Sequence, residues 1–239
     1  MNLINTFRET KIMKEDCELE NKVNVLTELH NKYPNNEKIK DDLIYAKIGL
    51  NGEKTIIHEL KMANIGMYVL HDITFKYEDL TAQTDFIVIT PVKNYFIECK
   101  NLRGHLKINN TGSFTRKYES NNNRIEENIY SPLTQAKGHI NIYKKIWDKN
   151  HGLFDKLLFE KDFFKFNTPL VVMANPKNIL YDRFAPKEIK NKVIRADQLI
   201  NYLEKDLKDC KWHDRLSKKG MEEKAKFFLD NNTPNIVNY

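Results

Sequence analysis

Two residues with side chains suited to catalysis stand two positions apart in the segment YFIECKN, residues 95–101. The segment is otherwise typical of a buried strand, because aromatic and β-branched residues dominate it. Side chains alternate between the two faces of a strand, so Glu98 and Lys100 must lie on the same face. This spacing alone also fits a solvated strand face that carries a weak surface ion pair.

The segment just before it brings a second carboxylate to that face. DFIVITP begins at Asp85 and is separated from the next strand by so few residues that a tight hairpin is expected. A two-residue loop of Val92 and Lys93 places Asp85 opposite Lys100. A four-residue loop keeps Asp85 on the face of Glu98 and Lys100, whereas a loop with an odd number of residues moves it away.

Carboxylates that lie close together repel each other when both are ionised, and such a pair is typical of a site for a hard divalent cation. Mg²⁺ suits oxygen ligands best. A bound cation can activate a water molecule and offset the charge that develops on a phosphate. Lys100 can then orient that water or stabilise the transition state. The three residues therefore favour metal-dependent chemistry on a phosphate ester.

Two further side chains belong to helices that flank this hairpin. Asn51 is a good N-cap, so we expect a helix to begin there with Glu53 in its first turn, where a third carboxylate can approach the cluster. Gln135 stands four residues before His139 at the start of an apolar helical stripe and can reach the same cluster. An exposed first turn explains Gln135 equally well, and we assign His139 no role.

Several basic residues flank the same region and can contact phosphates, although a solvated charged face explains each of them individually. They are Lys54, Arg103, Lys107, Arg116, Lys117 and Lys137.

The elements that must position these residues follow from the periodicity of the apolar side chains. Helical spacing predicts two helices before residue 51 and a third from Asn51 with an apolar stripe that reaches Leu60. From about residue 67 the period changes to two, which is typical of an antiparallel meander. Ser131 and Pro132 predict the start of a helix. The remaining predicted elements are a buried strand over 168–175, a short strand over 192–196, and helices over 197–205 and about 211–229.

The composition is typical of an ordinary globular protein. We expect one main domain, because 239 residues are enough for one sizeable core. The formal net charge of +6 permits an anionic partner such as nucleic acid but does not demand one. The three cysteines are too few and too far apart for a disulfide framework, which favours a reducing, cytoplasmic location. We expect no membrane association, because no apolar run has the length of a signal peptide or a membrane span.

Several ordered motifs together resemble the nuclease-related domain (NERD) family, part of the PD-(D/E)XK, restriction-endonuclease-like superfamily. These motifs are GEKTIIHEL, MYVLHDITF, QTDFIVITPVKNYFIECKNLRGHL and SPLTQAKGHI, and the resemblance spans about residues 50–200. It implies an α/β fold with a mixed sheet: a restriction-endonuclease-like αβββαβ core, preceded by a helical N-terminal extension and followed by a C-terminal helix. We place the extension at residues 1–49, the nuclease-like domain at 50–207, and the C-terminal helix and tail at 208–239.

The resemblance also implies metal-dependent hydrolysis of phosphodiester bonds. Asp85 matches the motif aspartate, Glu98 and Lys100 match the E-x-K pair, and Glu53 matches the glutamate of the GE motif. Gln135 matches the glutamine of the following helix, and the backbone carbonyl of Cys99 is implied as a metal ligand. Two positions depart from the pattern. Phe86 stands where the family commonly has histidine, and Thr84 stands where the superfamily has proline.

Our leading hypothesis is a cytoplasmic nuclease that acts on DNA and depends on Mg²⁺ or Mn²⁺. A homodimer would place two sites on one duplex, whereas a single-strand cutter needs only one. The alternative is a non-cleaving module that keeps the fold and binds nucleic acid or a protein partner. A regulatory subunit that works only in a complex is a third reading, favoured if the helical extension forms a dimer or partner surface.

Overall fold

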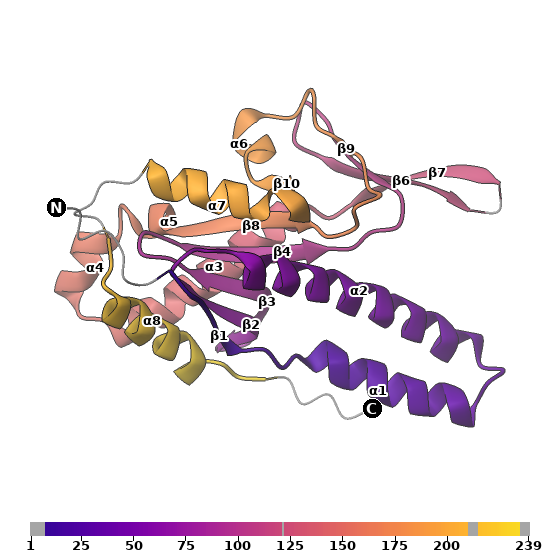
Figure 1. Cartoon of the computed structure of the whole chain (residues 1–239), viewed down its shortest axis with the longest axis horizontal. Coiled ribbons are helices and arrows are strands. Elements are labelled where there is room, and N and C mark those ends of the chain that lie inside the picture. The colour runs from indigo at the N-terminus through magenta and orange to yellow at the C-terminus, as the bar shows by residue number, and fades with distance from the viewer. Residues whose placement is uncertain (1–7, 121, 210–214, 235–239) are drawn as a thin grey trace.

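The computed structural model describes residues 8–120, 122–209 and 215–234, and their strands form two sheets (Figure 1). The central sheet has six strands in the order β1-β2-β3-β4-β8-β10. Its strands are β1 (Thr10–Lys14), β2 (Met67–Tyr77), β3 (Leu80–Ile89), β4 (Asn94–Lys100), β8 (Asn167–Met173) and β10 (Val193–Arg195). The second sheet has the order β7-β6-β5-β9. Its strands are β5 (His105–Ile108), β6 (Phe114–Ser120), β7 (Asn123–Ile129) and β9 (Leu180–Tyr181).

The helices pack mainly against the central sheet or extend from it. They are α1 (Glu18–Lys32), α2 (Glu37–Met62), α3 (Pro132–Asn150), α4 (Leu153–Phe159), α5 (Phe163–Phe166), α6 (Lys187–Lys190), the 3₁₀ helix η1 (Ala196–Gln198), α7 (Leu199–Lys208) and α8 (Lys218–Asp230). The first two form a hairpin that projects from the body of the molecule, on the same side as the β6–β7 hairpin (Figure 1). Among the described residues, no helix is both long enough and apolar enough to cross a membrane.

Alternate residues of β3 and β4 supply two separate cores, one on each face of the central sheet. On one face, Ile56 of α2 and Leu199 of α7 pack with Phe86 and Val88 of β3. On the other face, α3 and α8 cover the sheet, and their cluster contains Tyr143, Phe228 and the strand residues Ile87 and Phe96. The predicted αβββαβ core is thus present as α2, β2, β3, β4, α3 and β8, and the expected mixed α/β fold is confirmed.

The β3–β4 hairpin has the longer of the two loops considered for it. Ile89 pairs with Asn94 and Phe86 with Ile97, so residues 90–93 form a four-residue loop. The backbone N–H of Thr90 donates to the carbonyl of Lys93 at 2.9 Å and closes this loop. Continuing the register places Asp85 opposite Glu98 rather than opposite Lys100. The two-residue alternative is therefore wrong, but all three side chains remain on one face.

The predicted helix start at Asn51 is wrong as well, because α2 is continuous from residue 37 to residue 62. The N-cap of this helix is Asn36, whose side chain accepts a hydrogen bond from the N–H of Ile39 at 3.2 Å. Apolar positions such as Leu43 and Leu50 continue the buried stripe through Asn51. Glu53 consequently lies in the interior of a long helix, and the proposed domain boundary at 49/50 falls within that helix.

Other elements differ from the predictions at the edges of the sheets. Strands β1 and β7 were not predicted, because their polar sequences TKIMK and NRIEENI give a weak alternating pattern. The start of α3, with the Ser131 side chain as its cap and Pro132 in its first turn, is confirmed. The last predicted helix begins at Lys218 in the structure, and part of its predicted range, residues 211–214, lies outside the described residues.

Candidate metal centre

Asp85 is held by the backbone of the neighbouring strand. Its Oδ2 accepts a hydrogen bond from the N–H of Cys99 at 2.7 Å. Burial raises the pKa of the Asp85 carboxyl well above its usual range, and the negative charges of Glu98 and Glu53 raise it further. The N–H of Cys99 and the charge of Lys100 oppose this only partly. The surroundings therefore disfavour the carboxylate form unless a positive charge is added.

Glu98 has one satisfied oxygen and one unsatisfied oxygen. Its side chain is 4% exposed, and Oε1 accepts a hydrogen bond from Lys100 Nζ at 2.6 Å. Glu98 Oε2 is buried and has no hydrogen-bond donor among the described residues. Burial raises the pKa of Glu98 despite the neighbouring Lys100, and the charge of Glu53 adds to the increase. A divalent cation would satisfy both the unpartnered oxygen and the excess negative charge, so the residues present fit a metal ion.

Helix α3 approaches the same carboxylate with two polar side chains. Gln135 Oε1 lies 3.4 Å from Lys100 Nζ and accepts its hydrogen bond, so the ammonium group is held between Glu98 and Gln135. One turn further along, His139 Nδ1 lies 3.9 Å from Glu98 Oε2. Burial lowers the pKa of His139 to about 4, with a further contribution from Lys100, so the ring is neutral at pH 7.

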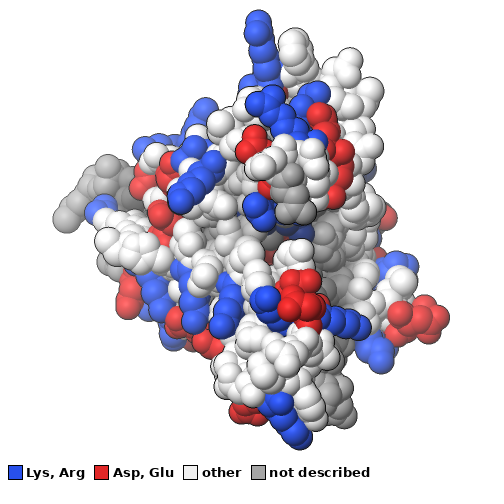
Figure 2. All heavy atoms as spheres, turned by 90° about the vertical axis from the view of Figure 1, so that its right-hand side faces the viewer, with Lys and Arg blue, Asp and Glu red and all other residues white. Residues whose placement is uncertain are grey.

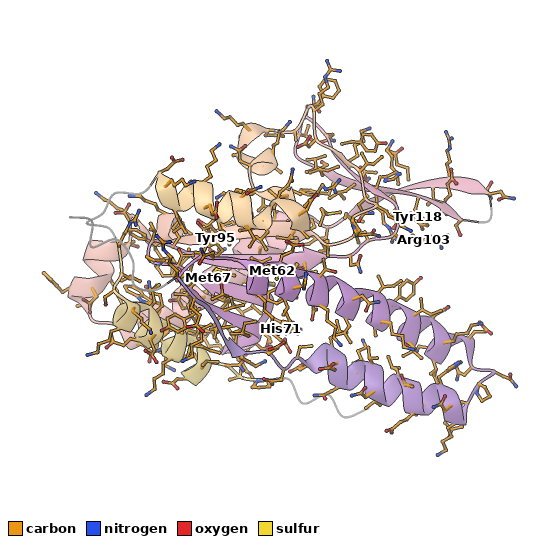
Figure 3. All side chains as sticks on the ribbon, viewed as in Figure 1. Met62, Met67, His71, Tyr95, Arg103 and Tyr118 are labelled. Atoms are coloured by element: carbon orange, nitrogen blue, oxygen red, sulfur yellow. The ribbon has the colours of Figure 1, made fainter. Side chains whose placement is uncertain are left out.

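Glu53 comes from α2, on the opposite face of the sheet from α3, and is held by a histidine that the sequence did not single out. His71 Nε2 lies 2.9 Å from Glu53 Oε2, and His71 Nδ1 lies 2.8 Å from the carbonyl oxygen of Glu15. The ring of His71 stacks on Phe86 with centroids 4.5 Å apart. His71 thus lies where β2, α2 and the chain leading into α1 meet (Figure 3).

A backbone irregularity in β2 lies next to this histidine. The register with β3 is the same on both sides of it, since His71 pairs with Phe86 and Ile73 with Thr84, but Asp72 between them has a φ of 56°. The Asp72 carboxylate accepts hydrogen bonds of 2.6 Å from the N–H of Glu18 and the side chain of Gln83. Asp72 therefore fastens the first turn of α1 to the sheet beside Glu53, at the cost of a backbone conformation that L-residues adopt only rarely.

Glu53 also belongs to a second group of potential ligands. Ligand atoms of Cys17, Glu53 and His71 all lie within 4.8 Å of one another, which makes this trio a possible metal-binding group. Burial and the charges of Glu53 and Asp72 raise the pKa of the Cys17 thiol to about 11, although a backbone hydrogen bond opposes the shift. Glu53 thus neighbours two groups of potential ligands, the Asp85–Glu98 carboxylates and the Cys17–His71 pair.

Gly52 lets α2 come close enough to the end of β4 for Glu53 to approach the pair. A Cβ atom at position 52 would lie 2.6 Å from Asn101 Cβ and 3.2 Å from Cys99 Sγ. We expect Gly52→Ala to lower the free energy of unfolding by about 1–3 kcal/mol, because the helix must shift away from the strand.

Urea unfolding of the purified variant measures this effect, and Gly138→Ala is the matched control. Gly138 is also helical, but a Cβ there meets no atom within 4 Å. The control should gain up to about 1 kcal/mol from the better helix propensity of alanine. Equal stability changes in the two variants would contradict the close approach of α2 to β4.

The structure brings together the side chains that the sequence selected. Asp85, Glu98 and Lys100 share one face, Gln135 bonds to Lys100, and Glu53 is close enough for its charge to affect both carboxyls. Cys99 contributes its backbone N–H, which donates to Asp85.

The sequence assigned no role to two histidines of the site, His71 and His139. The only sequence feature that could have placed His139 at the site is its spacing of four residues from Gln135, which puts both side chains on one face of a helix. Nothing in the sequence connects His71 with Glu53.

Comparison with known proteins adds one positive finding. A family model described as "Nuclease-related domain" (NERD) matches residues 48–174, just over half of the chain. The match runs from the middle of α2 to the end of β8 and includes all six site residues that the sequence predicted, whereas Cys17 lies outside it. Neither curated proteins nor solved structures give a match. By its sequence and by the mixed α/β fold that carries these residues, the chain belongs to the nuclease-related domain family.

Proposed function

We propose that this protein is a metal-dependent nuclease that hydrolyses phosphodiester bonds of DNA. The observation that carries the proposal is the buried, unpartnered Oε2 of Glu98, which lies beside a lysine and a second, half-buried carboxylate, that of Asp85. Carboxylates arranged only for stability would pair all their oxygens, because an unsatisfied buried acceptor costs about 1–3 kcal/mol.

Each residue has a distinct function in this proposal. Asp85 and Glu98 would hold Mg²⁺ or Mn²⁺, together with the carbonyl of Cys99, and Glu53 would contribute directly or through water. When bound, the metal ion supplies a Lewis acid for the phosphate and lowers the pKa of a water molecule.

Lys100 orients the attacking water and offsets the negative charge that develops on the phosphate. The ammonium is held for this task from two sides, by Glu98 Oε1 at 2.6 Å and by Gln135 Oε1 at 3.4 Å. Gln135 is thus a positioning residue, while Lys100 touches the reacting atoms.

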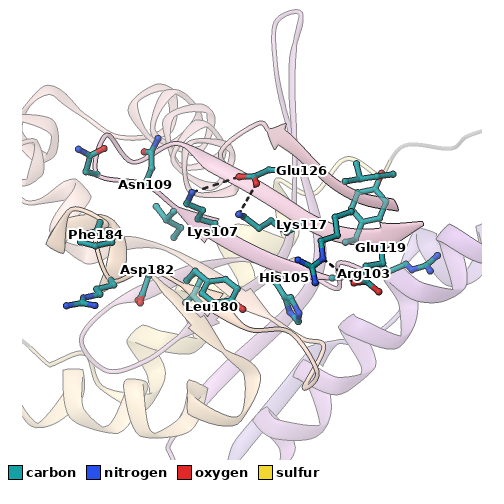
Figure 4. Close-up of a pocket in the computed structure, with 18 residues that line it drawn as sticks. Arg103, His105, Lys107, Asn109, Lys117, Glu119, Glu126, Leu180, Asp182 and Phe184 are labelled. Atoms are coloured by element: carbon teal, nitrogen blue, oxygen red, sulfur yellow. Dashed lines mark ion pairs between the residues drawn. The ribbon is translucent and has the colours of Figure 1, made fainter. Parts of the chain in front are cut away.

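A cavity on the second sheet supports a nucleic acid as the substrate (Figure 4). Its volume is about 1430 Å³, and it begins at Arg103, three residues after Lys100. Its basic lining residues are Arg103, Lys107, Lys117, Arg124 and Arg183, and its acidic ones are Glu119, Glu126 and Asp182. The aromatic rings of Tyr118, Tyr181 and Phe184 also line it. Basic groups combined with aromatic rings suit a nucleic acid strand, because bases stack on the rings while phosphates meet the cations.

The face that carries the two projecting hairpins agrees with this substrate. Figure 2 shows Lys and Arg side chains around a hollow in that face, with Asp and Glu side chains interspersed among them. The carboxyl end of β4, where Lys100 lies, points toward the same side of the molecule (Figure 1). A DNA strand between the hairpins would therefore approach the candidate metal centre.

The test is incubation of the purified protein with supercoiled, linear and single-stranded DNA at low salt, with Mg²⁺, Mn²⁺ or EDTA. We expect cleavage with a divalent cation and none in EDTA, and the product pattern separates nicking from end-directed digestion. A parallel preparation of Glu98→Gln shows whether a contaminating nuclease is responsible. Cleavage that persists in EDTA or in this variant would overturn the proposal.

The second candidate function is a module that binds DNA without cutting it, and the cavity on the second sheet favours it as much as it favours a nuclease. A gel-shift of the same samples separates the two. A binding module retains DNA equally well with Mg²⁺ and with EDTA and leaves the substrate intact over time. Loss of substrate that requires the cation excludes this candidate.

A further inference from the structure

The imidazole of His139 has no task in the hydrolysis proposed above, yet it is buried against the carboxylate at the centre of the site. His139 is 9% exposed and lies one turn beyond Gln135 on α3. Its Nδ1 has no hydrogen-bond partner among the described residues, and the same is true of Glu98 Oε2. Each unpartnered buried atom costs about 1–3 kcal/mol, so two of them facing each other are costly unless something is bound between them.

The distance between these two atoms fits a shared metal ion. Glu98 Oε2 and His139 Nδ1 are 3.9 Å apart, which is too long for a direct hydrogen bond. Two ligand atoms that each lie about 2.1 Å from one ion are separated by about 3.0 Å at a right angle and by about 4.2 Å in line. The observed separation falls inside this range, so the two atoms are spaced to bind one ion.

The other oxygen of Glu98 is already occupied, which assigns the two sides of the carboxylate to different partners. Lys100 donates to Oε1 at 2.6 Å, and Gln135 accepts from Lys100 on the same side. Oε2 faces His139 instead. Helix α3 therefore supplies two groups to the site, one for the lysine and one for the position beside Oε2.

We propose that His139 is a direct ligand, through Nδ1, of the divalent cation that Glu98 holds, and that it makes the site prefer Mn²⁺ to Mg²⁺. The inference rests on the proposed function, because the same cation serves the proposed hydrolysis. Mg²⁺ prefers an all-oxygen shell and keeps several waters, whereas Mn²⁺ accepts carboxylate oxygen and imidazole nitrogen together, as in the di-manganese sites of helical bundles that combine glutamates with histidines.

Electron spin echo spectroscopy of the Mn²⁺-loaded protein tests the ligand directly, because a coordinated imidazole nitrogen modulates the echo of the bound ion. We expect ¹⁴N modulation in the wild-type protein and its loss in His139→Gln. His58→Gln is the matched control, since His58 is exposed on α2, and should retain the modulation. His71→Gln is a second comparison, because His71 belongs to the neighbouring ligand group with Cys17 and Glu53.

Cation affinity is the second measurement. Loss of one ligand should weaken Mn²⁺ binding by about tenfold or more in His139→Gln, while Mg²⁺ binding changes by less than about threefold. Circular dichroism of each variant shows that the fold is intact before the affinities are compared. An equal loss of affinity for Mn²⁺ and Mg²⁺ in His139→Gln would overturn the proposal that His139 makes the site prefer Mn²⁺.

The spectroscopic result does not depend on catalysis, so failure of the ligand assignment and failure of the proposed function are distinguishable. Wild-type protein that binds Mn²⁺ without ¹⁴N modulation overturns the assignment, even if the protein cuts DNA. Modulation that survives in His139→Gln and disappears in His71→Gln also overturns it and places the ion at the Cys17 group. Modulation that requires His139 in a protein that cuts no DNA supports the ligand and contradicts the nuclease.

Discussion

Replacement of Glu98 by glutamine is expected to abolish DNA cleavage, with a loss of at least about 10³-fold in rate. The loss corresponds to about 4 kcal/mol of transition-state stabilisation, which is the scale of a metal ion's contribution to phosphate chemistry. The glutamine amide can still accept the Lys100 hydrogen bond at Oε1, so the packing around β4 is retained. What disappears is the negative charge that the proposed cation requires at Oε2.

The rate of cleavage with saturating Mn²⁺ is the measurement, and Glu223→Gln is the matched control. Glu223 lies on α8 with a side chain that is 66% exposed, so the same change of charge there should leave the rate within about twofold. Gel filtration and a thermal melt show that both variants are folded. Wild-type rates in the Glu98 variant would show that this carboxylate holds no catalytic cation.

The hairpin at the centre of the site was predictable because strand geometry restricts it. Period-two alternation fixes the face of Glu98 and Lys100, and either even-numbered loop puts Asp85 on that face. The loop length itself was not predictable. The hydroxyl of Thr90 accepts a hydrogen bond from the N–H of Lys93 at 3.1 Å and stabilises the four-residue loop, and the sequence TPVK does not reveal this contact.

The positions of Glu53 and His71 depend on contacts between distant parts of the chain. His71 meets the carbonyl of Glu15, 56 residues away, and Asp72 meets the backbone of Glu18 across 54 residues. Local propensity favoured a helix start at Asn51, but the apolar stripe on both sides of that residue packs against the sheet and against α1. Tertiary packing therefore overrides the capping preference of one asparagine.

The second sheet was harder to predict than the central one. β6 carries mainly polar side chains, and only Phe114 at its first position is fully buried, so its pattern gives no information about its partners. β9 has two residues, Leu180 and Tyr181, and it pairs with β5 from more than 70 residues away. The cavity is lined by residues of both strands and depends on that pairing, and so the aromatic lining of the proposed DNA surface could not be found from spacing alone.

Asp85 and Glu98 are expected to make the metal-free protein less stable at neutral pH than it would be without them. The folded-state pKa of Asp85 is raised above that of the unfolded chain, so this carboxyl ionises more readily after unfolding. The protonated Asp85 carboxyl therefore contributes fully to the free energy of unfolding below the unfolded-state pKa, about 4. This contribution is lost as the pH rises through the raised folded-state pKa.

Asp85→Asn is therefore expected to stabilise the metal-free protein at pH 8 while it removes cleavage. The asparagine side-chain oxygen can still accept the N–H of Cys99, and no charge has to be buried. We expect a gain of about 0.5–2 kcal/mol, equivalent to a few degrees in Tm for a chain of this length. The gain should shrink as the pH is lowered toward about 4 and disappear below it, where the wild-type carboxyl is protonated in both states.

Thermal melts at several pH values, with EDTA and with Mn²⁺, measure both effects together. Mn²⁺ should raise the Tm of the wild-type protein, because a ligand that binds only the folded state stabilises it, and should change that of Asp85→Asn much less. A variant that is less stable than wild type at pH 8 would mean that the Asp85 carboxylate contributes to folding. The raised pKa of Asp85 would then give no support to a cation site at this carboxylate.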